Sequence, residues 1–584
     1  MRRLAWLTVA LFLTGTALTE EHEDFASYLQ WERAAGILSP QQELVLRVLA
    51  MVNPEALPEP YRSLPREPGK CGTMTMWEVK SRWHELNTVQ QQTLAPYVSR
   101  PTLPQSLVSP TGHFKIHYTT SPGADQTTEE FAHEAAVAFD KAWQVEVDEL
   151  GYPPPPPDFG IDGPEYDVYI QNISDYGWTY PELPVVQTEE SDWTTYIVVD
   201  NDYSRGFYTK GLDGLRVTAA HEFFHAIHFG IREPFREPES TADLFYYEVS
   251  ATWMEDVVWD HINDYYNYLG DFFRTTHLPF NSTDGRREYG MAVWNHFVAK
   301  RVGPEAIRDS WLAMKGMHGL QAIRQALLPR GLTLEDALGE FALWNAFTGS
   351  RADTIRFYPE GAHYPQVRFH QHLVLEERVD VADSCRRMAT KYYLLLPQLP
   401  APYGATLISS DPSRWRLSLA VFGPTKGNGD FSPGGAFCSL GHLAPVDTVV
   451  VAASRTNLAD QDLGLGKTAF YAFSLIVEMG FPPTEAPTGN AITQVSSNPF
   501  RLQENALLTV LLHLETEEEV AMSVRDLHGR VVFEEALGVV GPRRAYPWVW
   551  RGENQHGGKV AAGIYFIVAR FSDGVSIEKV AVVR

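Results

Sequence analysis

The sequence has 584 residues, of which 44% are hydrophobic, and its formal net charge is −25, from 48 Lys and Arg against 73 Asp and Glu. At about 100–200 residues per domain, this length predicts several domains. The hydrophobic content excludes a disordered chain, which buries too little apolar surface to fold. The negative charge argues against nucleic acid as a partner, because phosphate backbones would be repelled. With only three cysteines, a disulfide-stapled scaffold is excluded as well.

The first 19 residues have the pattern of a secretory signal peptide. Arg2 and Arg3 precede an apolar run over residues 4–18, which is too short to cross a bilayer comfortably. No later segment reaches the length of apolar residues that a membrane helix needs, so we expect no transmembrane segment. The sequence therefore predicts a chain that is exported and then secreted or attached to the cell surface.

Residues 20–108 are predicted to form a helical N-terminal region, because apolar residues recur there at helical spacing until prolines crowd after Pro54. From residue 109 to residue 365, strand and helix patterns alternate, which predicts an α+β domain. The expected strands cover residues 114–118, 166–170 and 196–199. The expected helices cover residues 127–150, 215–229 (with Asp213 as its N-cap), 244–260, 289–301 and 304–314.

Beyond residue 365 the helical pattern fades. Short apolar runs separated by Pro, Gly and Asp predict a β-sandwich over residues 366–480. Residues 481–495 have the composition of a linker, and turn and strand signals in residues 496–584 predict a second β-module with about six strands. The fold class expected is therefore a multidomain α+β chain that ends in two β-sandwich modules.

The strongest chemical motif is HEFFH at residues 221–225, inside a predicted helix. Side chains four residues apart lie on one helix face, so the imidazoles of His221 and His225 can converge on one metal ion. Glu222, directly after the first histidine, can reach a water held by that ion. Zinc lowers the pKa of bound water from 15.7 to about 7, and Glu222 would carry the proton from the water to the leaving amine. The motif predicts a Zn²⁺ cofactor and Glu222 as the catalytic residue.

A third zinc ligand is expected on the next predicted helix. Glu248 and Glu255 are seven residues apart on it and share one face, so their spacing leaves open which of them binds the metal. His228 shares the face of the motif histidines and is interpreted as a wall or core residue, because three protein ligands leave zinc the open position that catalysis needs. Tyr289 is a candidate donor to the transition state, although a packed aromatic ring is the simpler interpretation.

The segments HEFFHAIHFG and YEVSATWMED resemble the gluzincin metallopeptidases, in which two histidines of H-E-x-x-H and a glutamate on the next helix bind zinc. This resemblance implies a zincin-like catalytic domain over residues 109–365, with a mixed sheet and active-site helices. It also implies that His221, His225 and Glu248 are the metal ligands. Glu255 is then a carboxylate that supports a ligand, or the alternative third ligand.

Two departures from known branches stand out. The thermolysin-like branch has an aspartate four residues after the third ligand, where this sequence has Thr252. The metzincin branch needs Gly and His where His228 and Ile231 stand. Residues 252–256 also resemble a tail found in a group of secreted bacterial metalloproteases. The sequence therefore predicts a secreted bacterial zinc-dependent endopeptidase that acts on protein or peptide substrates.

Residues 20–108 stand where the propeptide of such an enzyme would lie. The segment around Cys71 faintly resembles the cysteine-switch segment of matrix metallopeptidases, because a thiolate can fill zinc's open position; an incidental cysteine is the simpler interpretation. Cys385 and Cys438 fall in the same β-module and could form a disulfide. Two other functions remain open. One is a noncatalytic surface adhesin or carbohydrate-binding protein with a degenerate or structural metal site, and the other is a glycosidase with paired carboxylates.

The last segment carries a second resemblance. Turn and strand signals such as VRDLHGRVV at 524–532 and AAGIYF at 561–566, and the ending KVAVVR, resemble the C-terminal sorting domain of the type IX secretion pathway, which is related to the Ig-like domain of flagellar hook-capping proteins. The resemblance covers nearly all of residues 496–584. It implies that the type IX secretion machinery is a partner and that the chain is released or anchored at the cell surface. An accessory β-domain is the alternative.

Overall fold

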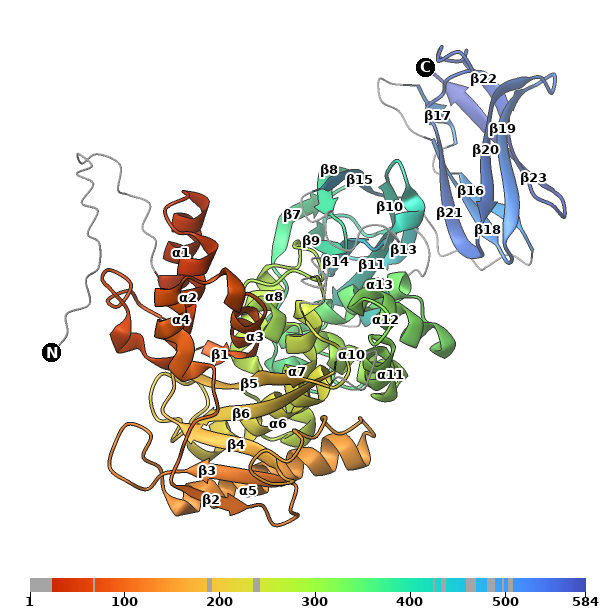
Figure 1. The fold of residues 1–584 in the computed structure, drawn as a ribbon. Coiled ribbons are helices and arrows are strands. Elements are labelled where there is room, and N and C mark those ends of the chain that lie inside the picture. Colours follow the sequence, from red (N-terminus) through yellow and green to blue (C-terminus); the bar gives the residue numbers. More distant parts are fainter. Residues whose placement is uncertain are drawn as a thin grey trace, which may run out of the picture. The chain divides into compact units, whose positions relative to one another are not determined.

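The structure is a computed structural model of a multidomain α+β protein (Figure 1). It describes residues 24–66, 69–185, 192–234, 242–423, 426–431, 437–457, 469–479, 489–495, 498–502 and 508–584. The expected signal peptide and most of the expected linker lie outside these residues. Within them, no helix has the length and apolar character needed to span a bilayer. The chain divides into two compact units, one of residues 1–137, 160–181 and 196–218, and one of residues 138–159, 182–195 and 219–584.

A mixed sheet, most of which belongs to the first unit, has the strand order β1-β5-β6-β4-β3-β2. Its strands are β1 (Gly69–Cys71), β2 (Gln105–Val108), β3 (Phe114–Tyr118), β4 (Tyr166–Gln171), β5 (Asp175–Pro184) and β6 (Trp193–Asp200). The pairs β3–β4, β4–β6 and β1–β5 are parallel, whereas β2 is antiparallel to β3. Strands β3, β4 and β6 overlap the three strands expected from the sequence.

The N-terminal region is folded and belongs to this sheet. Its helices are α1 (Phe25–Ala34), α2 (Pro40–Val52), α3 (Thr73–Ser81) and α4 (Thr88–Leu94). Side chains of α2 and α3, such as Val48 and Met76, share one hydrophobic core with Trp178 of β5 and Tyr196 of β6. Because β1 and β2 are also strands of the sheet, the domain boundary expected after residue 108 does not coincide with a structural boundary.

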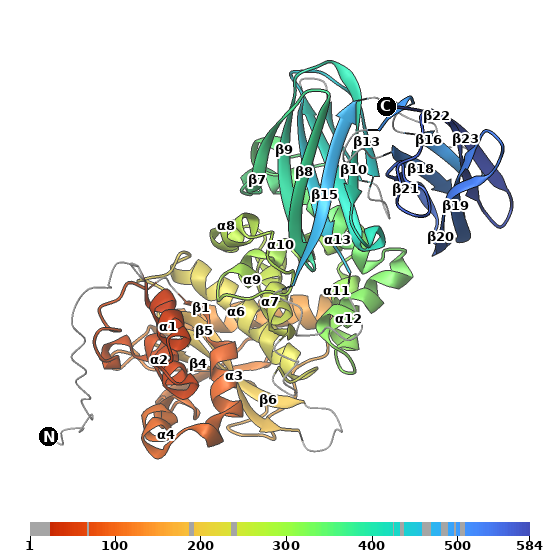
Figure 2. The ribbon, with the colours of Figure 1, turned by 90° about the horizontal axis from the view of Figure 1, so that it is seen from above.

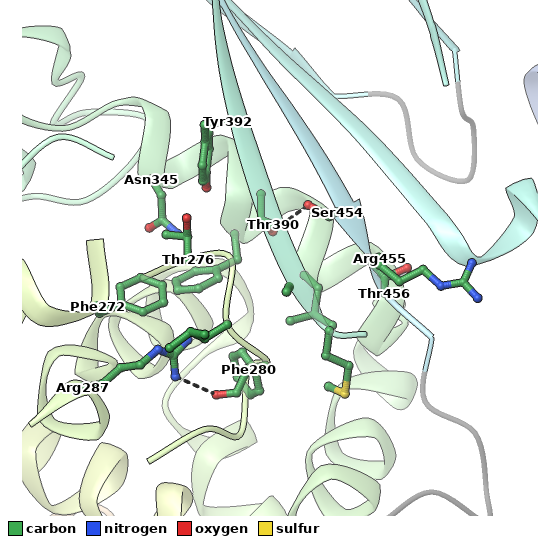
Figure 3. Close-up of a pocket in the computed structure, with 15 residues that line it drawn as sticks. Phe272, Thr276, Phe280, Arg287, Asn345, Thr390, Tyr392, Ser454, Arg455 and Thr456 are labelled. Atoms are coloured by element: carbon green, nitrogen blue, oxygen red, sulfur yellow. Dashed lines mark hydrogen bonds between the residues drawn. The ribbon is translucent and has the colours of Figure 1, made fainter. Parts of the chain in front are cut away.

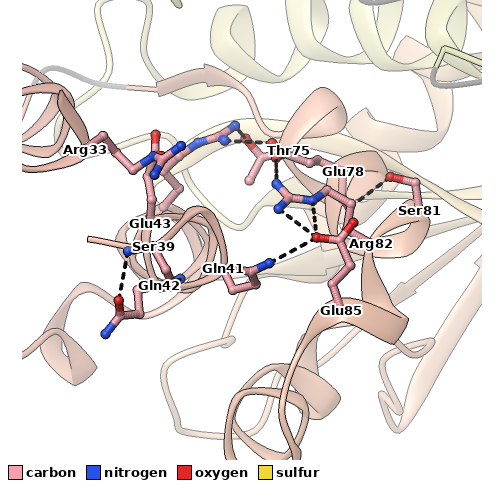
Figure 4. A network of polar contacts seen from close by, with 11 residues as sticks. Arg33, Ser39, Gln41, Gln42, Glu43, Thr75, Glu78, Ser81, Arg82 and Glu85 are labelled. Carbon is pink, nitrogen blue, oxygen red and sulfur yellow. Dashed lines mark hydrogen bonds and ion pairs between the residues drawn. The ribbon is translucent and has the colours of Figure 1, made fainter. Parts of the chain in front are cut away.

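Ion pairs add to the hydrophobic contact between α2 and α3 (Figure 4). The Glu78 carboxylate on α3 forms two ion pairs, from Oε2 to Arg47 Nη1 of α2 at 2.7 Å and from Oε1 to Arg82 Nη1 at 2.6 Å. Burial alone would raise the pKa of the Glu78 carboxyl, but the two guanidinium groups outweigh burial and lower it. These contacts order the N-terminal region as part of the first unit.

The helices that follow carry the candidate site. They are α5 (Glu129–Trp143), α6 (Gly211–Phe229), α7 (Leu244–Val258), α8 (Tyr266–Arg274), α9 (Arg287–Gly290), α10 (Ala292–Val302), α11 (Glu305–Ala313), α12 (Gly319–Leu327) and α13 (Leu334–Ala346). Helix α6 begins four residues before the expected start, so Asp213 lies in its first turn and is not its N-cap. The helix expected over residues 289–301 is interrupted at Met291, which separates α9 from α10.

The first β-module is a two-sheet sandwich (Figure 2). Its strands are β7 (Phe369–Leu375), β8 (Arg378–Arg386), β9 (Ala389–Pro397), β10 (Ala401–Ile408), β11 (Trp415–Gly423), β12 (Lys426–Phe431), β13 (Phe437–Leu443), β14 (Thr448–Arg455) and β15 (Phe470–Met479). One sheet has the order β13-β10-β15-β8 and the other β12-β11-β14-β9-β7. Cys385 is a free, buried thiol that donates to the carbonyl of Ala389 at 3.3 Å. The side chain of Cys438, the other half of the disulfide considered from the sequence, lies outside what the structure describes.

The C-terminal module is a second sandwich with its own core. Its strands are β16 (Ala491–Val495), β17 (Phe500–Arg501), β18 (Leu508–Leu514), β19 (Glu518–Asp526), β20 (Val531–Val540), β21 (Arg543–Trp550), β22 (Gly563–Arg570) and β23 (Val575–Val583). The sheets have the orders β16-β18-β21 and β17-β23-β22-β19-β20. Because β16 pairs with β18, the module begins inside the expected linker of residues 481–495, and it has more strands than the sequence predicted.

Candidate metal centre

Helix α6 carries the two motif histidines on one face and aromatic side chains on another. His221 and His225 are 1% and 0% exposed, and Glu222 between them is fully buried. Phe223 stacks on Trp143 with ring centroids 5.5 Å apart, and Phe224 meets Tyr152 edge to face at 4.8 Å. The aromatic packing fixes the rotation of the helix, so both imidazoles are presented on the same side.

Three side-chain atoms converge on one point. His221 Nε2 lies 3.1 Å from His225 Nε2 and 3.2 Å from Glu248 Oε2, and His225 Nε2 lies 3.5 Å from Glu248 Oε2. Ligand atoms at zinc bond lengths and tetrahedral angles are about 3.3–3.6 Å apart. The triangle is therefore close to one face of a zinc tetrahedron, and its donor set of two imidazoles and a carboxylate suits zinc.

The second ring nitrogen of His221 contacts Glu255. Glu255 Oε1 lies 2.6 Å from His221 Nδ1, and Glu255 is 1% exposed. A carboxylate behind a metal-binding histidine fixes the ring's tautomer and orientation. The two acidic residues that spacing could not distinguish thus lie on different sides of His221, with Glu248 beside Nε2 and Glu255 beside Nδ1.

This arrangement also accounts for Thr252, where the thermolysin-like branch has an aspartate. Thr252 is fully buried, and its hydroxyl has no hydrogen-bond partner among the described residues. Glu255, nearly one helical turn further along α7, contacts the ring nitrogen instead. The departure at Thr252 therefore does not leave His221 without a carboxylate.

His228 lies behind His225 rather than among the ligand atoms. Its Nδ1 is 3.4 Å from His225 Nδ1, and its ring stacks on Trp311 with centroids 3.7 Å apart and planes 15° apart. Burial, with a smaller contribution from the neighbouring histidines, lowers the pKa of His228 well below its usual range. The side chain is a neutral, stacked wall residue, as the sequence predicted.

The electrostatics keep both motif imidazoles neutral. Burial lowers the pKa of His221, and it lowers the pKa of His225 to about 3. A neutral imidazole offers the lone pair that a metal ion needs. Next to the triangle, burial raises the pKa of Glu288 to about 7, with Glu248 among the nearby charges that add to the shift. The site is therefore a buried environment of low dielectric, in which charges interact more strongly than in water.

Tyr289 on α9 lies near the helix pair. It is 5% exposed, and its ring centroid is 6.3 Å from that of His221. The sequence singled out this residue as a candidate, and the structure brings it beside the first motif histidine.

A small cavity elsewhere in the second unit is not part of this centre (Figure 3). It measures about 30 Å³ and is lined mainly by Phe272, Phe280 and Arg287 and by residues of β9 and β14. The Arg287 guanidinium donates to the carbonyls of Phe280 and Ser282, at 3.4 and 2.9 Å. The cavity has room for about one water molecule and is too small for a peptide.

No family model matches the chain, and no curated protein matches it significantly. Among solved structures, PorZ of the Porphyromonas gingivalis type IX secretion system is similar at 17% identity over 19% of this chain and 14% of its own, with a TM-score of 0.13. FlgD of P. aeruginosa is similar at 21% identity over 16% of this chain and 66% of its own, with a TM-score of 0.12. Latent PorU of P. gingivalis is similar at 15% identity over 32% of this chain and 18% of its own, with a TM-score of 0.14. The chain spans less than two thirds of the length of each of these three proteins. TM-scores this low support no functional argument.

Proposed function

We propose that this protein is a secreted zinc-dependent endopeptidase whose metal ligands are His221, His225 and Glu248. The observation that carries the proposal is the triangle of two Nε2 atoms and one Oε2 atom with edges of 3.1–3.5 Å. Three ligands leave a tetrahedral ion one open position, which is the arrangement of catalytic rather than structural zinc sites. When bound, zinc would polarise a scissile carbonyl and lower the pKa of water to about 7.

Residues of the chain would transfer the proton, orient a metal ligand and stabilise the oxyanion. Glu222 adjoins the first ligand in sequence and is fully buried; in this proposal its carboxylate takes a proton from the attacking water and returns it to the leaving amine. Glu255 keeps the Nδ1 of His221 occupied, which directs Nε2 toward the metal. Tyr289 is the candidate hydroxyl donor to the developing oxyanion, since its ring neighbours that of His221.

Removing zinc with a chelator and then adding it back tests this function. Casein hydrolysis by the purified chain should stop with 1,10-phenanthroline and return when Zn²⁺ is added. A noncatalytic adhesin with a structural metal site would show no hydrolysis before chelation. A glycosidase with paired carboxylates would keep its activity in the chelator. Hydrolysis that persists without zinc would contradict the proposal.

Replacing Glu255 with alanine is expected to weaken zinc binding by about 10–100-fold, because the His221 ring loses the carboxylate that orients it. Competition against a chromogenic zinc chelator measures the affinity. The matched control is Asp213→Asn on α6, whose side chain is 51% exposed and should leave the affinity unchanged. Wild-type affinity in Glu255→Ala would show that the contact does not support the metal.

We propose that residues 20–108 are a propeptide and that the Cys71 thiol can occupy the open position of zinc. Strand β1 of this region lies at the edge of the sheet and pairs in parallel with β5. A separate peptide segment can add to a sheet edge in the same way, which supports the proposal. Against simple release, α2 and α3 share a core with β5 and β6. N-terminal sequencing of the secreted chain distinguishes retention from removal.

The C-terminal module is proposed to direct export through the type IX secretion machinery. The support is its resemblance to sorting domains together with a separate core that includes Trp548, Trp550 and Ile567. Deleting residues 489–584 in a bacterium that has this pathway should leave the chain inside the cell, while the uncut chain reaches the surface or the medium. Immunoblots of the fractions measure this, and equal export of both forms would rule out the sorting role.

A further inference from the structure

A second group of acidic side chains lies at the C-terminal end of α7. Oxygen atoms of Asp256, Asp260 and Glu360 all lie within 4.8 Å of one another. Among the described residues, no lysine or arginine forms an ion pair with any of the three. His296 Nε2 lies 3.9 Å from Asp256 Oδ2, and burial lowers the pKa of His296 to about 4, so it carries no charge at neutral pH.

Asp256 is the member of the group that needs a partner. It is 7% exposed, and its Oδ1 has no hydrogen-bond partner within the described part of the chain. Buried carboxylates are almost always paired, hydrogen-bonded or bound to a metal, because an isolated buried charge is strongly unfavourable. Burial, followed by the charges of Glu360 and Asp260, raises the pKa of Asp256 to about 8. The protein thus places a nearly dry carboxylate against two others with no cation of its own.

Glu360 is oriented toward this group by neighbouring side chains. The Tyr265 hydroxyl donates to Glu360 Oε2 at 2.5 Å and lies 2.7 Å from the Tyr364 hydroxyl. The Asn263 amide nitrogen donates to both Glu360 oxygens, at 3.2 and 3.3 Å, in the amide orientation that satisfies both groups.

We propose that Asp256, Asp260 and Glu360 bind a calcium ion, with water molecules completing its coordination. All of these are hard oxygen donors, the ligand type that calcium takes in sets of six to eight with flexible geometry. Donors on opposite sides of one calcium ion are up to about 5 Å apart, which the group's 4.8 Å limit satisfies. Magnesium holds fewer carboxylates at shorter distances and keeps several waters.

The position of this site gives the ion a structural role. Asp256 directly follows Glu255, which orients the His221 ring from the same helix. Glu360 lies about a hundred residues further along the chain, so one ion would fasten the end of α7 to the segment around Glu360. The calcium site does not depend on the proposed peptidase activity, since none of its ligands belongs to the zinc triangle.

Calcium binding to the full-length protein tests the proposal directly. Isothermal titration of the calcium-free chain with CaCl₂ should show one site with a Kd of about 10⁻⁶–10⁻³ M. Tb³⁺, which replaces calcium and is excited by nearby tyrosines, should luminesce when bound and be displaced by CaCl₂. Calcium should also raise the unfolding temperature, because it binds the folded state. The absence of saturable binding up to about 10 mM CaCl₂ would overturn the proposal, as would Mg²⁺ binding as tightly as Ca²⁺.

Variants locate the ion. Asp260→Asn changes an exposed side chain, so the variant should fold, and it should weaken calcium binding at least tenfold. Asp256→Asn should abolish calcium binding. Asp148→Asn, an exposed acid outside the group, and His225→Ala in the zinc triangle should bind calcium like the parent. Unchanged binding in Asp260→Asn and Asp256→Asn would refute the assignment, and so would loss of binding in His225→Ala.

Discussion

Replacing Glu222 with glutamine is expected to slow peptide hydrolysis by about 10²–10⁴-fold, because the variant keeps the shape of the side chain but cannot accept a proton from the attacking water. Zinc should remain bound, since Glu222 is not one of the three atoms in the triangle. The measurement is kcat/KM on a fluorogenic peptide, with zinc content determined on the same preparation.

The matched control is Asp213→Asn, an exposed acid in the first turn of the same helix. It should hydrolyse the peptide at the parent rate. Wild-type kcat/KM in Glu222→Gln would remove Glu222 from the mechanism. Loss of zinc in that variant would instead mean that the glutamate holds the metal, which contradicts its assigned role.

Replacing His225 with alanine is expected to remove both zinc and activity. His225 Nε2 is 3.1 Å from His221 Nε2 and 3.5 Å from Glu248 Oε2, so the change deletes one corner of the triangle. Without bound metal the water keeps its high pKa, and hydrolysis should fall by at least about 10³-fold. Metal analysis after dialysis and the peptide assay measure the two losses.

His133→Ala serves as the control for this change, because the His133 side chain is 63% exposed on α5. It should keep its zinc and its activity. Calcium binding to His225→Ala, measured in parallel, shows whether the variant is still folded. A folded His225→Ala protein that retains zinc and hydrolyses peptide would exclude the proposed ligand set.

The motif helix could be predicted because its signal is local. The spacing of His221 and His225 and the apolar residues around them specify a helix with one metal-facing side, and α6 has this form. The roles of Glu248 and Glu255 could not be predicted in the same way. Their seven-residue spacing places both on one face of α7, and only the packing of α7 against α6 assigns one to Nε2 and the other to Nδ1 of His221.

Non-local pairing explains the parts of the fold that the sequence did not reveal. Strand β1 has three residues, and only its pairing with β5, about a hundred residues away, makes it a strand. Strand β16 lies in a segment with the composition of a linker, yet it pairs with β18. The calcium group depends on Glu360, which no periodicity connects to Asp256. Such contacts are fixed by tertiary packing, for which a single sequence carries no local pattern.

The zinc content of the full-length protein, purified without added metal and measured by mass spectrometry, tests the central claim most directly. The proposed centre predicts about one zinc ion per chain, lost in His225→Ala and retained in Glu222→Gln. A parent protein with less than about 0.1 zinc per chain that gains none on incubation with Zn²⁺ would contradict it.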